Sequence, residues 1–194
     1  MRNLIALAGM VFCLSSCAVN QGIVLNYNPE AHEKIVSNKT ISVNVSDERP
    51  FIKDKSKPSA FIGKFRGGYG NPWNAYTDGK VPLAQVFVQD LVKEVKALGL
   101  QMQESNADRT IKVEILDYNF DAYINGRFWY EIKISVLDQN NVVLDENTFK
   151  DEIEIKGSFW LGPMGAFKDK LPEVHQSILK RMIRENSQLI DTLR

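Results

Sequence analysis

Hydrophobic and polar residues alternate with the period of a β-strand in residues 40–46, where Ile41, Val43 and Val45 share one face. Residues 110–116 repeat this alternation. Such a pattern is typical of strands that bury one face and leave the other in water. Both stretches therefore predict strands of a sheet that is covered on one side.

The chain from residue 110 to residue 155 predicts three strands joined by short turns. After residue 116 the alternation shifts phase, which indicates a β-bulge near Leu116-Asp117. Asn125-Gly126 is a tight-turn pair, and residues 138–141 offer a second turn. Strands connected in this way form an antiparallel meander.

Two other stretches have the period of an amphipathic helix. Residues 82–98 carry one apolar stripe between Pro82, which suits the first helical position, and Gly99, which suits the C-terminal stop. Residues 172–193 carry a second stripe. The order strand, helix, three strands, helix predicts an α+β fold: a mostly antiparallel sheet of about four strands, with two helices packed on one face.

Residues 47–80 show no lasting period and contain three prolines and five glycines. A segment this long without regular structure is uncommon in a compact domain and is usually functional or mobile. Its part from 61 to 73 mixes apolar residues with glycines and predicts a short hairpin folded onto the core. Arginine and aromatic residues are the usual anchors of interfaces. The candidate partner-binding residues are accordingly Arg49, Phe65, Arg66, Tyr69 and Trp73.

Each of these candidates has a structural alternative. The aromatic residues could pack in the core, and Arg49 could form a local salt bridge that fixes the loop beside Asp47 and Glu48. Asp117 and Asp121 could pair as acid and base, but alternation places both on the face opposite Tyr118, where solvation is expected.

The N-terminus has the parts of a secretory signal. Arg2 precedes an apolar run over residues 4–14 that is too short to span a membrane, and small residues precede Cys17. A cysteine directly after Leu-Ser-Ser resembles the lipobox of bacterial lipoproteins, whose cysteine is acylated on its sulfur and later on its amine. This resemblance implies a mature chain that begins at lipidated Cys17; the alternative is an ordinary signal peptide.

The predicted division of the chain into segments follows from a mature N-terminus at Cys17. Residues 1–16 are a signal peptide, residues 17–39 are lipidated Cys17 and a tether, and residues 40–194 are a single domain facing the periplasm. As a flexible coil the tether would reach roughly 25 Å. A short edge strand within it, at residues 23–27, is an open alternative.

Charge and composition narrow the function classes. The 24 basic and 24 acidic residues leave no basic excess for a nucleic-acid surface. Both cysteines, Cys13 and Cys17, belong to the first 17 residues, so the domain is expected to lack disulfides. With only His32 and His175 as imidazoles, no metal site and no cofactor are predicted. We expect His32 to be solvated and His175 to be half buried.

Recognisable catalytic motifs are absent from the sequence. The glycines of residues 63–70 lack the spacing of a P-loop, and no helix follows them directly, as a dinucleotide fingerprint requires. Neither histidine has a nucleophile in a recognisable context. The expected protein is therefore not an enzyme and has no catalytic residues.

Two segments carry a family resemblance. The sequence VNVSDERP at residues 43–50, with IGKFRGGYG at residues 62–70 and the helix that begins at Pro82, resembles the YajG-type family of bacterial lipoproteins. This resemblance implies an α+β domain that faces the periplasm at the outer membrane. By similarity to enterobacterial sorting, Ala18 after the acylated cysteine also implies the outer membrane.

The resulting prediction is a non-enzymatic accessory or interaction module of the bacterial envelope. Its expected partners are the membrane, through the lipid at Cys17, and an envelope protein, through residues 50–80. A glycan-binding lipoprotein is the alternative, with peptidoglycan as a possible ligand. In that case Trp129 or Phe159-Trp160 would stack on sugar rings.

Overall fold

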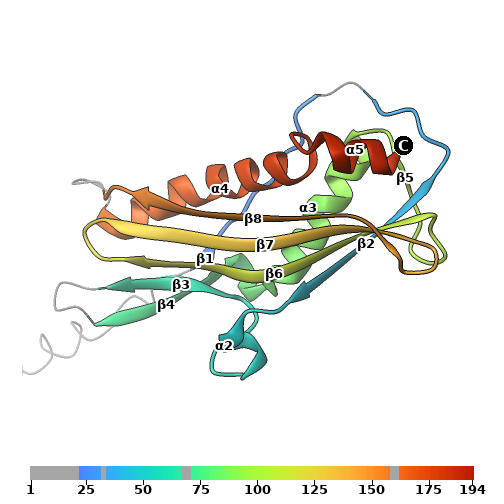
Figure 1. The fold of residues 1–194 in the computed structure, drawn as a ribbon. Helices are drawn as coiled ribbons and strands as arrows, with labels where there is room; N and C mark the ends of the chain where they lie inside the picture. Colours follow the sequence, from blue (N-terminus) through green and yellow to red (C-terminus); the bar gives the residue numbers. More distant parts are fainter. Residues whose placement is uncertain (1–21, 32–33, 67–70, 158–161) are drawn as a thin grey trace, which may run out of the picture.

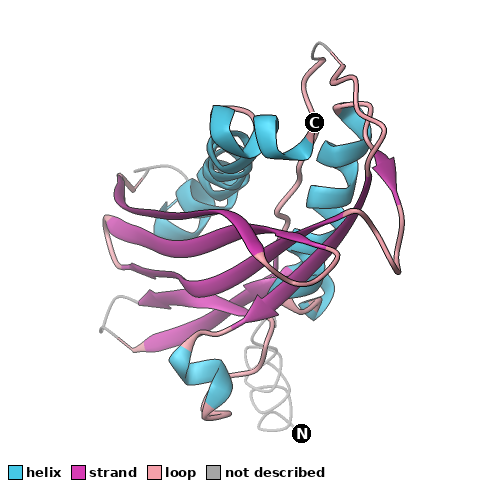
Figure 2. Ribbon diagram, turned by 45° about the vertical axis from the view of Figure 1, so that its right-hand side comes forward, coloured by secondary structure: helices cyan, strands magenta, loops and turns pink. Residues whose placement is uncertain are grey.

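The computed structural model describes residues 22–31, 34–66, 71–157 and 162–194, which form a curled sheet with its long helices on one face (Figures 1 and 2). The strands are β1 (Gly22–Ile23), β2 (Thr40–Asp47), β3 (Phe61–Arg66), β4 (Pro72–Thr77), β5 (Gln101–Met102), β6 (Arg109–Ala122), β7 (Gly126–Asp138) and β8 (Val143–Ile155). The helices are α2 (Pro50–Lys53), the 3-10 helix η2 (Asp78–Lys80), α3 (Leu83–Ala97), α4 (Gly162–Ile183) and α5 (Ser187–Leu193).

The long strand β6 organises the sheet. One edge of β6 pairs with β7 in an antiparallel ladder, and β7 pairs in turn with β8. Its other edge pairs in parallel with β2 as far as Ile115, and again in parallel with β3 from Asp121. Two strands therefore follow one another along the same edge of β6, and an interval separates them.

The predicted sheet was too small and too simple. The α+β class is confirmed, but the sheet has eight strands rather than about four, and its pairing is mixed rather than mostly antiparallel. The predicted meander is present as β6, β7 and β8, with the expected register shift between Ile115 and Asp117. The strands beyond the predicted four are β1 and β5, of two residues each, and β3 and β4, the predicted hairpin that was not counted as part of the sheet.

The described part of residues 47–80 forms α2, β3, β4 and η2 rather than one long loop. The predicted hairpin is confirmed as the antiparallel pair of β3 and β4. Gly63 in β3 takes a φ of 152°, and a Cβ there would lie 2.3 Å from the ring of Phe120. A glycine at this position therefore lets β3 approach the core closely.

The helices cover one face, as predicted, but the last one has different bounds. Helix α4 begins at Gly162, so that Pro172 lies inside it rather than at its start. It ends at Ile183, and Asn186 caps the separate helix α5 by accepting a hydrogen bond from the Leu189 N–H at 3.2 Å. An asparagine side chain is a good N-cap, which explains why the helix stops and restarts here.

The segment predicted as a tether packs against the domain from residue 22 onward. Ile23, Leu25 and Tyr27 are buried, and β1 pairs in parallel with β4. The side chain of Gln176 in α4 donates to the Asn28 carbonyl at 3.4 Å. We call residues 22–31 the strap. Residues 22–31 thus belong to the domain rather than to the predicted tether, and the alternative of a short edge strand at residues 23–27 agrees with β1 only at Ile23.

Candidate functional site

Four strands bring polar and aromatic side chains together at one end of the sheet. Strands β3 and β6 end there and β4 and β7 begin there, since Phe65 pairs with both Trp73 and Ala122, and Ala122 pairs with Gly126. The β6–β7 loop and the start of α4 lie at this same end (Figure 1). Residues that are far apart in the chain therefore share one surface.

Arg66 and Asp121 form the polar centre of this surface. The Arg66 Nε donates to Asp121 Oδ1 at 2.7 Å, and Nη2 donates to Oδ2 at 2.6 Å. Lys64 Nζ lies 3.1 Å from the same carboxylate. The hydrogen bonds from Arg66 are the main reason why the pKa of Asp121 is lowered. The bidentate pairing of Arg66 with Asp121 holds the guanidinium in one orientation.

A shallow depression of about 350 Å³ lies beside this pair. It is lined by Arg66, Asp121, Tyr123, Asn125, Gly126, Arg127, Trp129 and Glu154. Burial raises the pKa of the neighbouring Asp117, and a hydrogen bond with Trp129 opposes that rise. Arginine and aromatic groups around a polar floor suit the binding of a polar peptide or a sugar.

The structure separates the predicted partner-binding residues. Arg66 borders the depression, on the face of the sheet opposite the helices, whereas Trp73 pairs with Phe65 and so lies on the other face of the same hairpin. The Trp73 side chain is 48% exposed. Tyr69 and the predicted lipidation site Cys17 lie outside the described residues, as does His32.

Arg49 and Phe65 are buried, at 0% and 2% exposure, so their placement does not fit the predicted contact with a partner. Phe65 packs against Phe120 and Phe167 with ring centroids 5.0 and 6.1 Å away. The alternative of a local salt bridge holds for Arg49, which contacts both carboxylate oxygens of Asp47.

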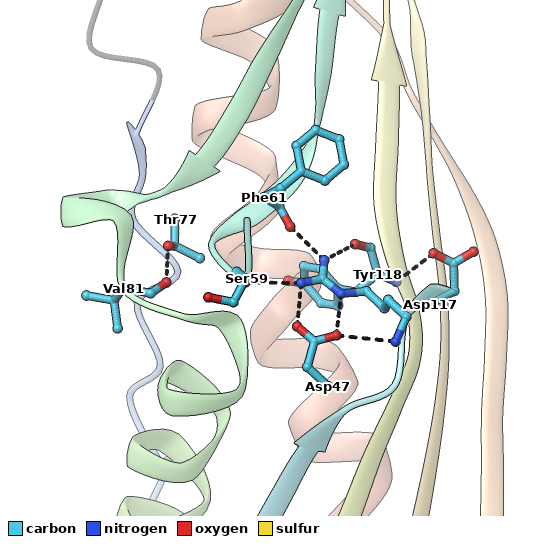
Figure 3. A network of polar contacts seen from close by, with 8 residues as sticks. Asp47, Ser59, Phe61, Thr77, Val81, Asp117 and Tyr118 are labelled. Atoms are coloured by element: carbon cyan, nitrogen blue, oxygen red, sulfur yellow. Dashed lines mark hydrogen bonds and ion pairs between the residues drawn. The ribbon is translucent and has the colours of Figure 1, made fainter. Parts of the chain in front are cut away.

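The Arg49 guanidinium joins the end of β2 to β3 and β6, because its partners Asp47, Phe61 and Tyr118, which Figure 3 shows close together, come from these three strands. Its Nη1 donates to the carbonyls of Phe61 and Tyr118 at 2.6 and 3.0 Å, and its Nη2 donates to the carbonyl of Ser59 at 3.2 Å. With two bonds to Asp47, all five N–H donors of the side chain are used. We call this arrangement the Arg49 network; its role is structural.

Sequence reasoning missed a buried polar chain between the sheet and the helices. His175 is fully buried rather than half buried. Its Nε2 lies 3.0 Å from Asp90 Oδ2, and its Nδ1 lies 3.2 Å from the Tyr118 hydroxyl. A tautomer protonated on Nε2 satisfies both contacts, with Tyr118 as the second donor. The one hint of this buried chain in the sequence was Asp90, an acidic residue beside the apolar stripe of α3.

A second buried network ties the strap to the helices. Glu94 in α3 accepts hydrogen bonds from the Tyr27 hydroxyl and from Nε and Nη2 of Arg184, and the Nη2 contact measures 2.9 Å. Arg184 Nη2 also donates to the Glu30 carbonyl at 2.9 Å. Glu94 and Arg184 are both almost completely buried. The network therefore holds the strap between α3 and the end of α4.

The described ranges contain neither a metal-binding cluster nor a membrane-spanning helix. Among residues 22–31, 34–66, 71–157 and 162–194, no group of three or more His, Cys, Asp or Glu side chains is placed to hold a metal ion. In the same part of the chain, no helix combines the length and apolar character needed to cross a bilayer.

Replacing Arg66 with alanine should raise the pKa of Asp121 toward its ordinary range, because the main cause of its lowering is removed. In the folded protein the lowered pKa stabilises the fold above the unfolded-state pKa, and this contribution is lost as the pH falls through the folded-state value. NMR titration of the Asp121 carboxyl measures the change. Asp108 is the control, since its pKa is lowered mainly by the Thr40 amide. An unchanged Asp121 titration would contradict the pairing.

Comparison with known proteins gives a shared fold. No protein-family model matches the chain, and no curated protein matches it. A crystal structure of a Xanthomonas campestris protein of the DUF330 family is similar, with a TM-score of 0.57 and 14% identity over 86% of this chain and 96% of that chain.

Two further crystal structures are less similar. One, of an uncharacterized protein, has a TM-score of 0.43 and 13% identity over 78% of this chain and 97% of that chain. The other, the lipoprotein GNA1162 from Neisseria meningitidis, has a TM-score of 0.31 and 11% identity over 74% of this chain and 96% of that chain. The chain thus shares its fold with the DUF330 protein, and this likeness assigns no activity.

Proposed function

We propose that this protein is a lipid-anchored accessory protein of the bacterial outer membrane that docks an envelope protein through the depression beside Arg66. The lipobox-like stretch before Cys17 supports the anchor, and the resemblance to YajG-type lipoproteins supports the periplasmic side of the outer membrane. The domain acts by binding rather than by chemistry on a substrate.

One observation carries the docking proposal: Arg66, Arg127 and Trp129 converge on the depression from β3 and β7. Arg127 is 71% exposed and pairs with Glu152 at 3.0 Å. Exposed arginine and aromatic side chains supply large contact areas and directed hydrogen bonds, which is why they dominate binding energy at interfaces. A partner with acidic and aromatic groups would complement this surface.

Crosslinking in living cells tests the proposal. A photo-reactive amino acid at Arg127 should give a discrete adduct of higher mass. The adduct should disappear when Arg66 is replaced with alanine, although circular dichroism shows that this variant still folds. Lys150 is the matched control, because it is 72% exposed on the same face but lies in β8, pairing with Glu131. Equal adducts from positions 127 and 150, or an adduct that persists without Arg66, would contradict docking at this depression.

A glycan is the second candidate ligand, and Trp129 is the observation that favours it. Its indole lines the same polar depression, where a sugar ring could stack on it while Arg66 and Asp121 bond to hydroxyl groups. The purified domain should then be retained on isolated peptidoglycan sacculi, and Trp129→Ala should abolish retention. No retention above that of the variant would remove this candidate.

A further inference from the structure

Three exposed apolar side chains lie at the end of the sheet where the depression lies: Tyr123 lines the depression, Trp73 is on the other face of the sheet, and Ile124 is in the β6–β7 loop. Trp73, Tyr123 and Ile124 are 48%, 43% and 69% exposed. Trp73 pairs through Phe65 with Ala122, and Tyr123 and Ile124 follow Ala122 directly in the chain. We call these three side chains the loop-end patch. Large apolar side chains exposed together at one end of a domain make that end a candidate contact surface.

The chain length before the strap limits where the anchor can lie. Gly22 is the first described residue, and it pairs with Tyr76 of β4. Cys17 stands five residues earlier, so it lies within about 18 Å of Gly22 even if the chain is fully extended. The distance along β4 from Tyr76 back to Pro72, at the end of the sheet that carries the loop-end patch, is about 13 Å. The acylated residue can therefore reach the level of the loop-end patch.

The opposite end of the sheet is out of reach. Val142 in the β7–β8 turn is 56% exposed, so that end carries apolar surface too. Tyr76 pairs with Phe61, and the Arg49 network holds the carbonyls of Phe61 and Tyr118 together. The distance along β6 from Tyr118 to Arg109, at the opposite end of the sheet, is about 30 Å. This distance exceeds the length of the five residues that join Cys17 to Gly22.

The chemistry of the loop-end patch suits the surface of a bilayer. Tryptophan and tyrosine are enriched at membrane interfaces, where one end of the ring is apolar and the other is wet. Two exposed cations, Arg127 and Lys156, flank the patch. Lys156 is placed there by its neighbour Gly157, whose N–H donates to Asn125 Oδ1 at 3.1 Å. Basic side chains at this height can reach anionic headgroups.

We infer that the loop-end patch, Trp73, Tyr123 and Ile124, rests in the lipid headgroup region of the membrane that holds the anchor. This inference rests on the proposed lipidation of Cys17. The anchor and the patch then form two contacts with the same bilayer, and together they set the domain with its strands steeply inclined to the membrane. The β7–β8 turn points away from the lipid, and Tyr123, which also lines the Arg66 depression, places one rim of that depression at the lipid.

A single introduced cysteine reports the contact. Both natural cysteines lie within the first 17 residues, so a thiol placed at Ile124 is unique once Cys17 is acylated. The lipidated full-length protein with Ile124→Cys, labelled with an environment-sensitive fluorophore, is inserted into vesicles of phosphatidylethanolamine and phosphatidylglycerol that contain a nitroxide-labelled lipid. Val142→Cys, labelled in the same way, is the matched control at the far end.

The expected result is several-fold stronger quenching and a blue-shifted emission at position 124 relative to position 142. Equal or weaker quenching at 124 would overturn the inference. A label at 124 that becomes protected as protein concentration rises, without quenching by the lipid, would assign the patch to a second copy of the chain and also overturn it. Mass spectrometry of the same sample separates the two proposals: unmodified Cys17 defeats both, whereas acylated Cys17 with an unquenched label at 124 defeats the bilayer contact alone.

Discussion

Replacing Arg49 with methionine should lower the free energy of unfolding by about 3–5 kcal/mol, the usual cost of breaking a buried ion pair from one side. Methionine keeps the apolar stem but removes the charge opposite Asp47, whose side chain is only 9% exposed. It also leaves the carbonyls of Phe61 and Tyr118 without their donor in the interval between β2 and β3. Denaturant unfolding measures the loss.

Two further variants show whether the Arg49 network is the cause. The double variant Asp47→Leu with Arg49→Met should recover part of the loss, because no unpaired charge then remains buried. Lys53→Ala should change stability little, since Lys53 pairs with Glu48 on the exposed surface. If Arg49→Met proved as mild as Lys53→Ala, the guanidinium would not hold β2, β3 and β6 together.

Replacing Glu94 with leucine should lower the free energy of unfolding by a similar amount, about 3–5 kcal/mol, because it leaves the buried Arg184 guanidinium without its carboxylate partner. It also removes the acceptor of the Tyr27 hydroxyl, so the strap loses its main polar link to α3. The amides of residues 23–30 should then exchange with solvent faster than those of the meander. Hydrogen exchange, together with denaturant unfolding, measures both effects.

Glu173→Ala is the matched control for Glu94, since Glu173 is an exposed helical acid that pairs with Lys170. It should leave both stability and exchange near those of the wild type. Adding Arg184→Met to Glu94→Leu should restore part of the lost stability. Unchanged exchange of the strap in Glu94→Leu would mean that apolar burial of Ile23 and Leu25 alone holds the strap, and that the Glu94 network does not.

The elements that were predicted correctly have a period within a single stretch of sequence. Helix α3 shows its stripe between Pro82 and Gly99, and β6 to β8 alternate across clear turn signals. The elements that were missed have no such local pattern. Strand β5 has two residues, and β1, also of two residues, was expected only as an alternative at residues 23–27. The parallel pairing of β2 and β3 along one edge of β6 joins segments far apart in sequence.

The candidate site was predicted less completely, for the same reason. Arg66 is the last residue of the glycine-containing β3 and reaches the surface, as a candidate contact residue must. Arg49 is buried because β2 and β3 leave an interval that only the three-dimensional pairing creates. His175 finds Asp90 and Tyr118 from separate elements, so no spacing in the chain could reveal their contact.

Mass spectrometry of the N-terminal peptide of the mature protein, purified from bacterial membranes, tests the anchoring of this domain most directly. The expected spectrum shows a chain that begins at Cys17 and carries a diacylglyceryl group on sulfur and a fatty acyl group on the amine. A mature protein recovered in the aqueous fraction with a free thiol at Cys17, or with a different first residue, would contradict the account.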